Sequence, residues 1–235
     1  ILLWFIIRKE KTLQMRLKDF RRKDWKLTKD FLKVGIPIVA HEMIWSAGTT
    51  AGSSITGQMS TTIVAGYNVA NAMYQLMACT MNGILHACSV TIGKTIGSGA
   101  SREEIQREAY SLILIGLVGG SVLGMLTLLG GDLFISFYSL TDATRAFAKG
   151  FIAIFAAIWP FSGMEMTGMI AVLRAGGDGK TGFISDIFTM WIFTIPLAAA
   201  GAFMWDFSPY VIIGIIKFNI VLEALVGIWR IRSMK

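Results

Sequence analysis

A long stretch without charged residues limits most strongly what this chain can fold into. Between Glu42 and Lys94 lie 51 residues that include no Asp, Glu, Lys or Arg. A helix needs about 20 apolar residues to cross a membrane, so this stretch is too long for one crossing and suits two crossings joined by a tight turn. The sequence therefore predicts a helical membrane protein.

The overall composition supports the same interpretation. Of the 235 residues, 54% are hydrophobic and only 16% are charged, whereas soluble domains carry roughly 25% charged residues. The net charge of +7 can indicate nucleic-acid binding, but the cations lie between or beside the apolar stretches. We therefore expect the lipid bilayer, and no nucleic acid, as a partner. Cys79 and Cys88 both lie in an apolar stretch and are expected to be buried free thiols rather than a disulfide.

The apolar stretches predict an all-α polytopic membrane protein, a bundle of six transmembrane helices. The predicted spans are residues 31–57, 67–96, 109–129, 150–173, 183–205 and 210–229, with polar loops that include 58–66 and 130–149. Before the third span, Ser101 and Glu104 fit a capping box. Within that span, Gly116, Gly120 and Gly124 predict close contact with a neighbouring helix.

The segments around this bundle divide the chain further. Residues 1–7 are apolar but too short to span a membrane, so we interpret them as the end of a preceding transmembrane helix in a longer protein. Residues 8–30 are predicted to form a basic cytoplasmic linker that is attracted to anionic lipid. Residues 31–230 then form the six-helix unit, and residues 231–235 form a short cytoplasmic tail.

The positive charges predict how the bundle is oriented in the membrane. With the basic linker inside the cell, 19 of the 22 Lys and Arg residues lie at the inner ends of the spans. Only Arg145 and Lys149 lie outside, and Lys217 lies within the membrane. Because cytoplasmic loops are enriched in Lys and Arg, both ends of the chain are predicted to face the cytoplasm.

Glu42 is the first candidate for a functional residue. It follows Pro37 by a little over one helical turn, and Pro37 can bend the helix and leave backbone carbonyls unpaired near the acid. A carboxylate embedded at this position suits a group that alternately binds and releases a proton or Na⁺. The alternative is a structural Glu at the membrane interface that accepts a hydrogen bond from a neighbouring helix.

Two further acids lie inside predicted spans. Asp186 lies about one turn inside the fifth span, where it can pair with Arg174 or Lys180 or can line the same cavity as Glu42. Glu165 lies in the inner half of the fourth span and is a further candidate ligand for a coupling ion. Lys217 and Glu223, six residues apart on one helix, are expected to make their contacts across helices rather than with each other.

Other residues are candidates for shaping a polar cavity. Pro160 is predicted to bend the fourth span. His41, Trp45 and Asn68 are candidates for lining the cavity, while His86 is expected to be a polar packing residue. His41 and Glu42 diverge by about 100° on a helix, so they do not form one site by default. They are not part of a zinc-protease motif either, because Trp45 stands where the second histidine is required.

The segment AGGDGKT, residues 175–181, resembles a phosphate-binding loop only superficially. The Walker pattern requires glycine at the position of Arg174 and a strand before it, and neither is found in the sequence. We therefore interpret Arg174, Gly176, Gly177 and Asp178 as a tight cytoplasmic turn. No nucleophile with a neighbouring base and no metal-ligand spacing is apparent, so the chain is not expected to be an enzyme.

Several segments resemble one known family of transporters. LKVGIPIVAHEMIWSAGT, TTIVAGYNVA, SVTIGKTIGSG and LRAGGDGKTGFISDIFTMWIFTIPLAA are similar to the carboxy-terminal half of the multidrug and toxic compound extrusion (MATE) family, bacterial type. The resemblance extends from about residue 32 to residue 230. His41 stands where one bacterial branch of the family commonly has Asn.

The resemblance implies a protein of twelve helices in two lobes, with a cavity between the lobes. This chain would be the carboxy-terminal lobe, residues 8–30 would join it to the amino-terminal six-helix lobe, and the membrane would be the bacterial inner membrane. The family exports organic cations and other amphipathic compounds in exchange for Na⁺ or H⁺. Its embedded acids fall near Glu42 and Glu165, where Na⁺ would bind transiently, and no other cofactor or metal is implied.

Two other functions are compatible with these residues. A flippase for lipid-linked saccharides of the same broad fold would favour cationic residues in the cavity, whereas the embedded charges here are mostly acidic. A membrane assembly module without transport activity would not require three isolated acids and several embedded prolines. Both remain alternatives to the antiporter.

Overall fold

The computed structural model describes residues 24–233, and over this range the chain is helical, with no strand. The elements are α2 (Trp25–Gly57), α3 (Thr61–Gly97), α4 (Arg102–Ser136), α5 (Asp142–Glu165), η2 (Met166–Leu173), α6 (Gly179–Asp186), η3 (Ile187–Thr194), α7 (Ile195–Phe203) and α8 (Pro209–Arg232). The segments η2 and η3 are π-helical and continue α5 and α6 without a break. The predicted all-α bundle is confirmed.

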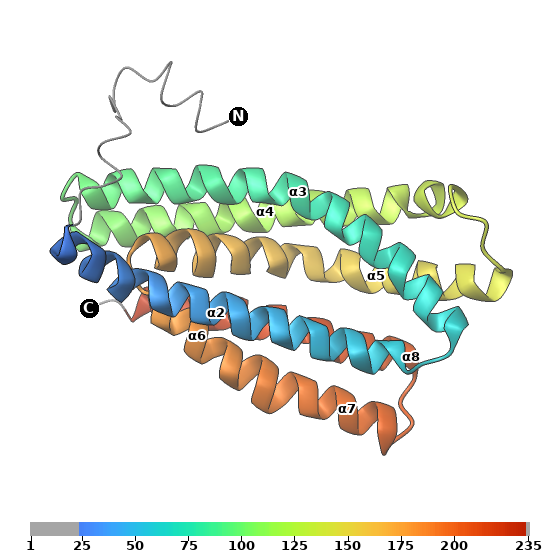
Figure 1. The fold of residues 1–235 in the computed structure, drawn as a ribbon. Helices are drawn as coiled ribbons and strands as arrows, with labels where there is room; N and C mark the ends of the chain where they lie inside the picture. Colours follow the sequence, from blue (N-terminus) through green and yellow to red (C-terminus); the bar gives the residue numbers. More distant parts are fainter. Residues whose placement is uncertain (1–23, 234–235) are drawn as a thin grey trace.

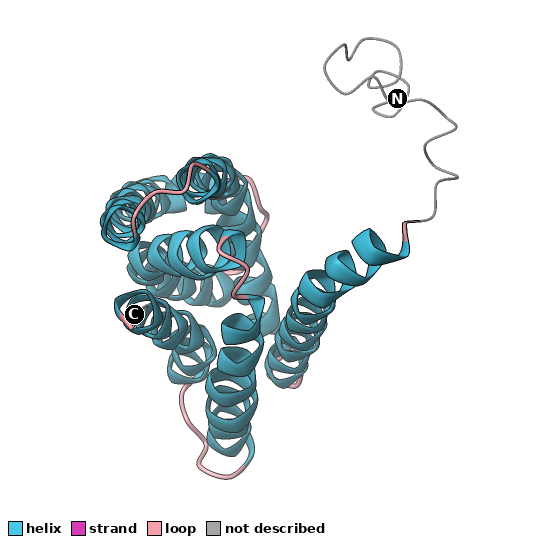
Figure 2. Ribbon diagram, turned by 90° about the vertical axis from the view of Figure 1, so that its left-hand side faces the viewer, coloured by secondary structure: helices cyan, strands magenta, loops and turns pink. Residues whose placement is uncertain are grey.

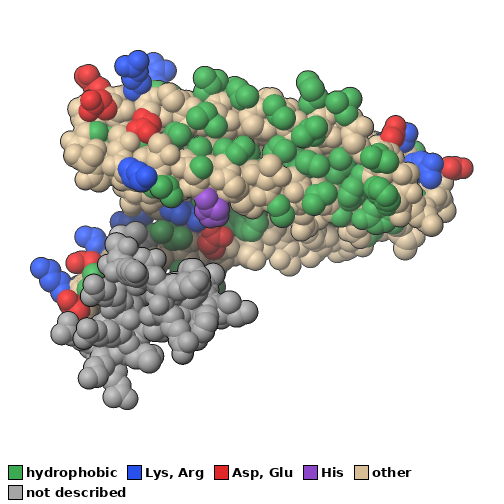
Figure 3. Space-filling model, turned by 90° about the horizontal axis from the view of Figure 1, so that it is seen from above, with side chains coloured by type: hydrophobic (Ala, Val, Ile, Leu, Met, Phe, Trp, Pro, Cys, Tyr) green, Lys and Arg blue, Asp and Glu red, His purple; other side chains and the backbone are tan. Residues whose placement is uncertain are grey.

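The helices run back and forth along one long axis (Figure 1). The turns after α3 and after η2 lie at the same end as the start of α2 and the end of α8. Charged side chains gather at the two ends, and hydrophobic side chains cover much of the face between them (Figure 3). This distribution is that of an integral membrane protein. The side of the membrane that each end faces stays a prediction.

Among residues 24–233, five helical stretches are long and apolar enough to cross a membrane: residues 61–97, 102–136, 142–173, 179–203 and 209–232. The first predicted span lies in α2, which is a continuous helix but a less apolar one. Residues 25–30 of the predicted linker form its first turns, and Asp24 caps it by accepting from the N–H groups of Lys26 and Leu27. Residues 1–23 and 234–235 lie outside the described residues, and the predicted end of a preceding helix, residues 1–7, is among them.

The predicted loops 58–66 and 130–149 are wrong in length. The first is only residues 58–60, because α3 begins at Thr61. The second is only residues 137–141, because Thr141 accepts a hydrogen bond from the N–H of Thr144 and so starts α5 early. Polar residues at the ends of these helices, beyond the apolar core, have the composition of a loop. The capping box is confirmed, since Ser101 N donates to Glu104 Oε2 at 2.8 Å and Glu104 N donates to Ser101 Oγ at 3.3 Å.

The closest helix contact joins α4 to α5 along the predicted glycine row. Gly120 lies against the backbone carbonyl of Trp159, and Gly116 and Gly124 lie against the carbonyls of Gly163 and Ala156. Trp159 itself is fully buried. The three glycines therefore permit backbone-to-backbone packing, as the four-residue spacing predicted.

The helix α2 lies to one side of this pair, as a view from the end of the bundle shows (Figure 2). It packs mainly on the continuous helix α6–η3–α7. Near its end, Ile55 joins Ala198 and Ile212 in a small apolar cluster. The residues of α2 that face α6 are therefore brought next to those of η2 and α8.

The glycine row leads to a stability prediction. Replacement of Gly120 by alanine places a Cβ against the Trp159 carbonyl, which cannot move without shifting α5. We expect a loss of about 1–3 kcal/mol in unfolding free energy, seen as a lower midpoint in thermal unfolding of the purified protein in detergent. Gly83→Ala is the matched control, because a Cβ there meets no atom within 4 Å. Equal midpoints for the two variants would contradict the close packing.

Candidate functional site

A cluster of polar side chains lies where α2, α6, η3 and α8 meet. Asp186, the last residue of α6, is fully buried, with 0% of its surface exposed. Its Oδ2 lies 2.9 Å from Nδ1 of His41 on α2. This is an ion-pair contact, and neither Asp186 oxygen is assigned a hydrogen-bond partner among the described residues. Asp186 is thus a buried acid whose main neighbour is an imidazole.

Glu223 of α8 completes the buried part of the cluster. It is 4% exposed, and its Oε1 accepts hydrogen bonds from Asn219 Nδ2 at 2.6 Å and from Thr189 Oγ1 at 3.3 Å. The carboxyl groups of Glu223 and Asp186 are close neighbours. Two adjacent buried carboxylates repel each other, and sharing one proton relieves that repulsion. This pair can therefore bind a cation or a proton with a large change in local charge.

Glu165 lies at the edge of the same electrostatic environment. It is the last residue of α5, directly before η2, and its charge interacts with those of Asp186 and His41. Asp186 occupies the equivalent place directly before η3. π-Helical turns within α-helices occur frequently at functional sites. The two acids thus share a local backbone feature as well as a neighbourhood.

Glu42 has a different environment from the other acids. Its Oε1 lies 2.9 Å from Arg174 Nη2, and its side chain is 52% exposed. Arg174 follows η2, so this ion pair joins α2 to the end of the α5–η2 helix. The structure therefore pairs Arg174 with Glu42 and His41 with Asp186. Asp186 therefore pairs with neither Arg174 nor Lys180, which were its two possible ion-pair partners in the sequence.

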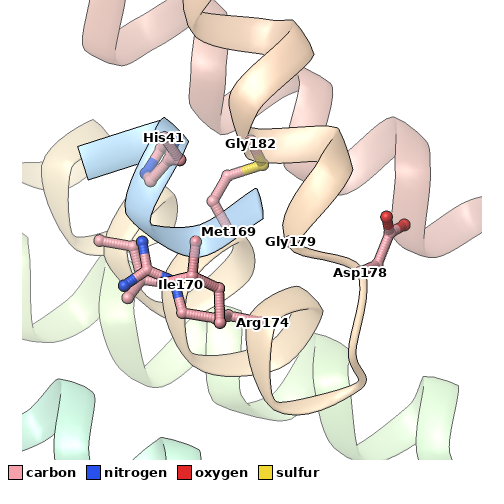
Figure 4. Close-up of a pocket in the computed structure, with 8 residues that line it drawn as sticks. His41, Met169, Ile170, Arg174, Asp178, Gly179 and Gly182 are labelled. Atoms are coloured by element: carbon pink, nitrogen blue, oxygen red, sulfur yellow. The ribbon is translucent and has the colours of Figure 1, made fainter. Parts of the chain in front are cut away.

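A small pocket opens beside His41 and Arg174 (Figure 4). Met169 and Ile170 of η2 line it with apolar side chains, and Gly182 of α6 also lines it. An added Cβ at Gly182 would meet the ring of His41 at 3.1 Å. The glycine therefore permits α2 to bring His41 close to α6, which is how the imidazole reaches Asp186.

The predicted cytoplasmic turn closes one end of the site. Gly177 has a φ of +80°, a conformation that favours glycine. Asp178 caps α6 through Thr181, and its Oδ2 also accepts from Nε of Arg230 on α8 at 2.7 Å. In Figure 4 its side chain points away from the pocket. The turn therefore ties α6 to α8, as a structural element rather than a phosphate site.

The other candidates lie apart from the acid cluster. Pro37 lies one turn before His41, close to Gly179, and α2 continues through it. Pro160 lies in the contact between α5 and Gly120 and is likewise inside a continuous helix. Trp45 and Asn68 are exposed and line no described pocket.

Sequence reasoning missed the role of Glu223 and Asn219. The expected contacts of Lys217 and Glu223 across helices are confirmed, since Glu223 bonds to Thr189 of η3. The local signal was present, because Asn219 and Glu223 are four residues apart and so lie on the same face of a helix. Their neighbour Asp186 is distant in sequence and could not be inferred from spacing.

Comparison with known proteins identifies the family. The sequence profile of the family described as MatE matches residues 37–200. The multidrug resistance protein MdtK of Yersinia pestis (strain Pestoides F) is 22% identical over 194 residues, which are 82% of this chain and 42% of that protein. The probable multidrug resistance protein NorM of Xanthomonas campestris pv. campestris is 24% identical over 185 residues, covering 79% of this chain and 40% of NorM.

The fold is shared with solved structures. A crystal structure of MATE in the straight conformation has a TM-score of 0.82 at 16% identity and covers 98% of this chain and 52% of that one. The chain therefore spans less than half the length of the curated relatives and about half of the solved structure. The match of the family profile to most of the bundle shows that this chain belongs to the MatE family.

Proposed function

We propose that this chain is the carboxy-terminal lobe of a cation-coupled exporter of small amphipathic or cationic compounds. The observation that carries the proposal is the buried cluster of Asp186, His41 and Glu223, in which an unbonded carboxyl faces an imidazole and a second carboxyl. A charged group retained in a membrane bundle is a functional candidate by default. The similarity to proteins named for multidrug resistance supplies the substrate class.

The coupling ion in this proposal is a proton. His41 and the two carboxyls are groups that bind and release protons, and the carboxyl pair is suited to holding one between them. A site for Na⁺ at Glu42 or Glu165 would need further ligands, so Na⁺ is the second choice.

The cluster can couple proton binding to transport because it lies between helices, including α2 and α6. Protonation of Asp186 removes its negative charge and so weakens its electrostatic attraction to a protonated His41, which is one of the contacts between α2 and α6. A change in that contact alters the relative stability of the inward-facing and outward-facing arrangements of the two lobes. An ion can drive transport only if it binds these two arrangements with different affinity. A basic substrate would compete with the proton for the same negative charge.

The proposal also includes the surroundings of the lobe. The partner is an amino-terminal lobe of six helices, the membrane is the bacterial inner membrane, and both ends of this chain face the cytoplasm. The support is the positive charge of the predicted inner ends and the coverage of about half of a solved transporter.

Asp186→Asn tests the function directly. The variant keeps the shape of the side chain but cannot release a proton, so we expect ethidium efflux from drug-sensitive bacteria to fall at least tenfold. The measurement uses the full-length transporter with proton and Na⁺ gradients imposed separately, and membrane levels are checked by immunoblot. Val118→Ala, on the exposed face of α4, is the control and should retain efflux.

Three results of this assay would change the proposal. Efflux that requires only the Na⁺ gradient would replace the proton by Na⁺. Normal efflux by Asp186→Asn would remove the cluster from the mechanism. If the wild type reached the membrane but exported no ethidium under either gradient, the flippase or the non-transporting module would become the better interpretation.

Glu42→Gln is expected to have a weaker effect in the same assay. Glu42 is half exposed, and an exposed ion pair contributes about 1 kcal/mol or less, so loss of its bond to Arg174 should reduce efflux about two- to fivefold. The measured quantity is the initial efflux rate of Glu42→Gln divided by that of Asp186→Asn. Complete loss of efflux in Glu42→Gln, with normal expression, would assign coupling to Glu42 instead.

A further inference from the structure

The first turns of α2 form a separate surface at one end of the lobe. In Figure 2 they project away from the other described helices. The residues Trp25, Leu27 and Phe31 are 79%, 68% and 72% exposed. Further along, α2 meets α6 where Pro37 lies close to Gly179. The described part of the lobe therefore leaves these three large apolar side chains largely uncovered.

The charged and apolar residues of these turns lie on opposite sides of the helix. At about 100° per residue, the three lysines fall within an arc of about 60°, and the large apolar residues fall within a separate arc of about 160°. The lysine face consists of Lys26, Lys29 and Lys33, and the apolar face consists of Trp25, Leu27, Phe31 and Leu32. This separation is typical of a helix that lies in a membrane interface.

The lysine face carries an excess of positive charge. Its three lysines are exposed, and none of them takes part in an ion pair within residues 24–233. Asp30 lies at the edge of this face, so three positive charges and one negative charge leave a net charge of +2. Asp24 precedes the helix, where its carboxylate accepts hydrogen bonds from backbone N–H groups. The lysine face is therefore complementary to an anionic surface.

The length of α2 places these turns at the level of the lipid headgroups. The helix has 33 residues and is therefore about 50 Å long, whereas the hydrocarbon layer of a bilayer is about 30 Å thick. A tilt of about 20°, typical of membrane helices, shortens its reach only to about 47 Å. All of its charged residues lie between residues 26 and 42, so the excess length belongs to this end. Trp and Lys side chains are favourable at that depth.

We propose that residues 25–33 form an interfacial segment that binds the headgroups of anionic phospholipids. The apolar face contacts the upper part of the acyl chains, and the lysine face binds the phosphate groups beside them. Lipid is the occupant that offers both kinds of contact at this depth. The bound lipid holds the beginning of the helix that carries His41, about 12 Å beyond Lys33. The lipid contact does not depend on the proposed export function.

Quenching of tryptophan fluorescence by brominated lipids tests this segment. The full-length transporter is reconstituted into phosphatidylcholine vesicles that contain increasing fractions of brominated phosphatidylglycerol or of brominated phosphatidylcholine. The emission of Trp25 is obtained as the difference between the wild type and Trp25→Phe. We expect phosphatidylglycerol to quench this emission with an apparent affinity about fivefold higher than that of phosphatidylcholine. The preference should disappear in the triple variant Lys26→Gln, Lys29→Gln and Lys33→Gln.

A matched control removes the same charge from another part of the same end. The cations at the end of α3 and the beginning of α4 are also exposed, and that turn lies at the same end of the lobe as the beginning of α2. The triple variant Lys94→Gln, Arg102→Gln and Arg107→Gln therefore loses three positive charges as well. Because these residues do not belong to the lysine face, the control should retain the preference of Trp25 for phosphatidylglycerol.

Three outcomes would overturn the lipid-binding segment. If neither lipid quenched Trp25, the segment would lie in water or against the other lobe. Equal quenching of the wild type by the two lipids would show that the headgroup is not recognised. Loss of the preference in the control variant as well would assign it to the overall positive charge of this end. Because the measurement requires no transport, these results are independent of ethidium efflux, which tests the export function itself.

Discussion

The cost of placing charge in an apolar bundle governs the arrangement of this protein. Several embedded charged side chains lie where another group offsets them in part: His41 beside Asp186, Arg174 beside Glu42, and aromatic rings beside Lys217. These partners come from different helices, so the positions of α2, α6 and α8 depend on them. Asp186 is compensated only in part, because it is fully buried and, apart from its contact with His41, has no hydrogen-bond partner among the described residues.

Two of the embedded acids lie where a helix changes its pitch. Glu165 and Asp186 each end an α-helix at the point where a π-helical segment begins. A π-turn places more residues in one turn and rotates the following side chains relative to the preceding ones. In η3 that rotation accompanies the hydrogen bond from Thr189 to Glu223, which joins the acid of α8 to the helix that carries Asp186.

Local and periodic features of the sequence were predictable, and contacts between distant residues were not. Uncharged length predicted the bundle, the spacing of Ser101 and Glu104 predicted a helix start, and the glycine row predicted the α4–α5 contact. The loop at 130–149 was overestimated because polar helix ends resemble loops in composition. The pairing of His41 with Asp186 depends on how α2 packs against α6, and no local pattern encodes that packing.

The two kinds of glycine contact give the lobe unequal stiffness. Gly120 meets the main chain of α5, whose torsions are held by the hydrogen bonds of the helix, so the contact between α4 and α5 is rigid. Gly48 of α2 instead meets the thioether of Met190, a flexible side chain that can adopt other rotamers. When the lobe deforms, α2 should therefore move more readily than the tightly packed pair of α4 and α5.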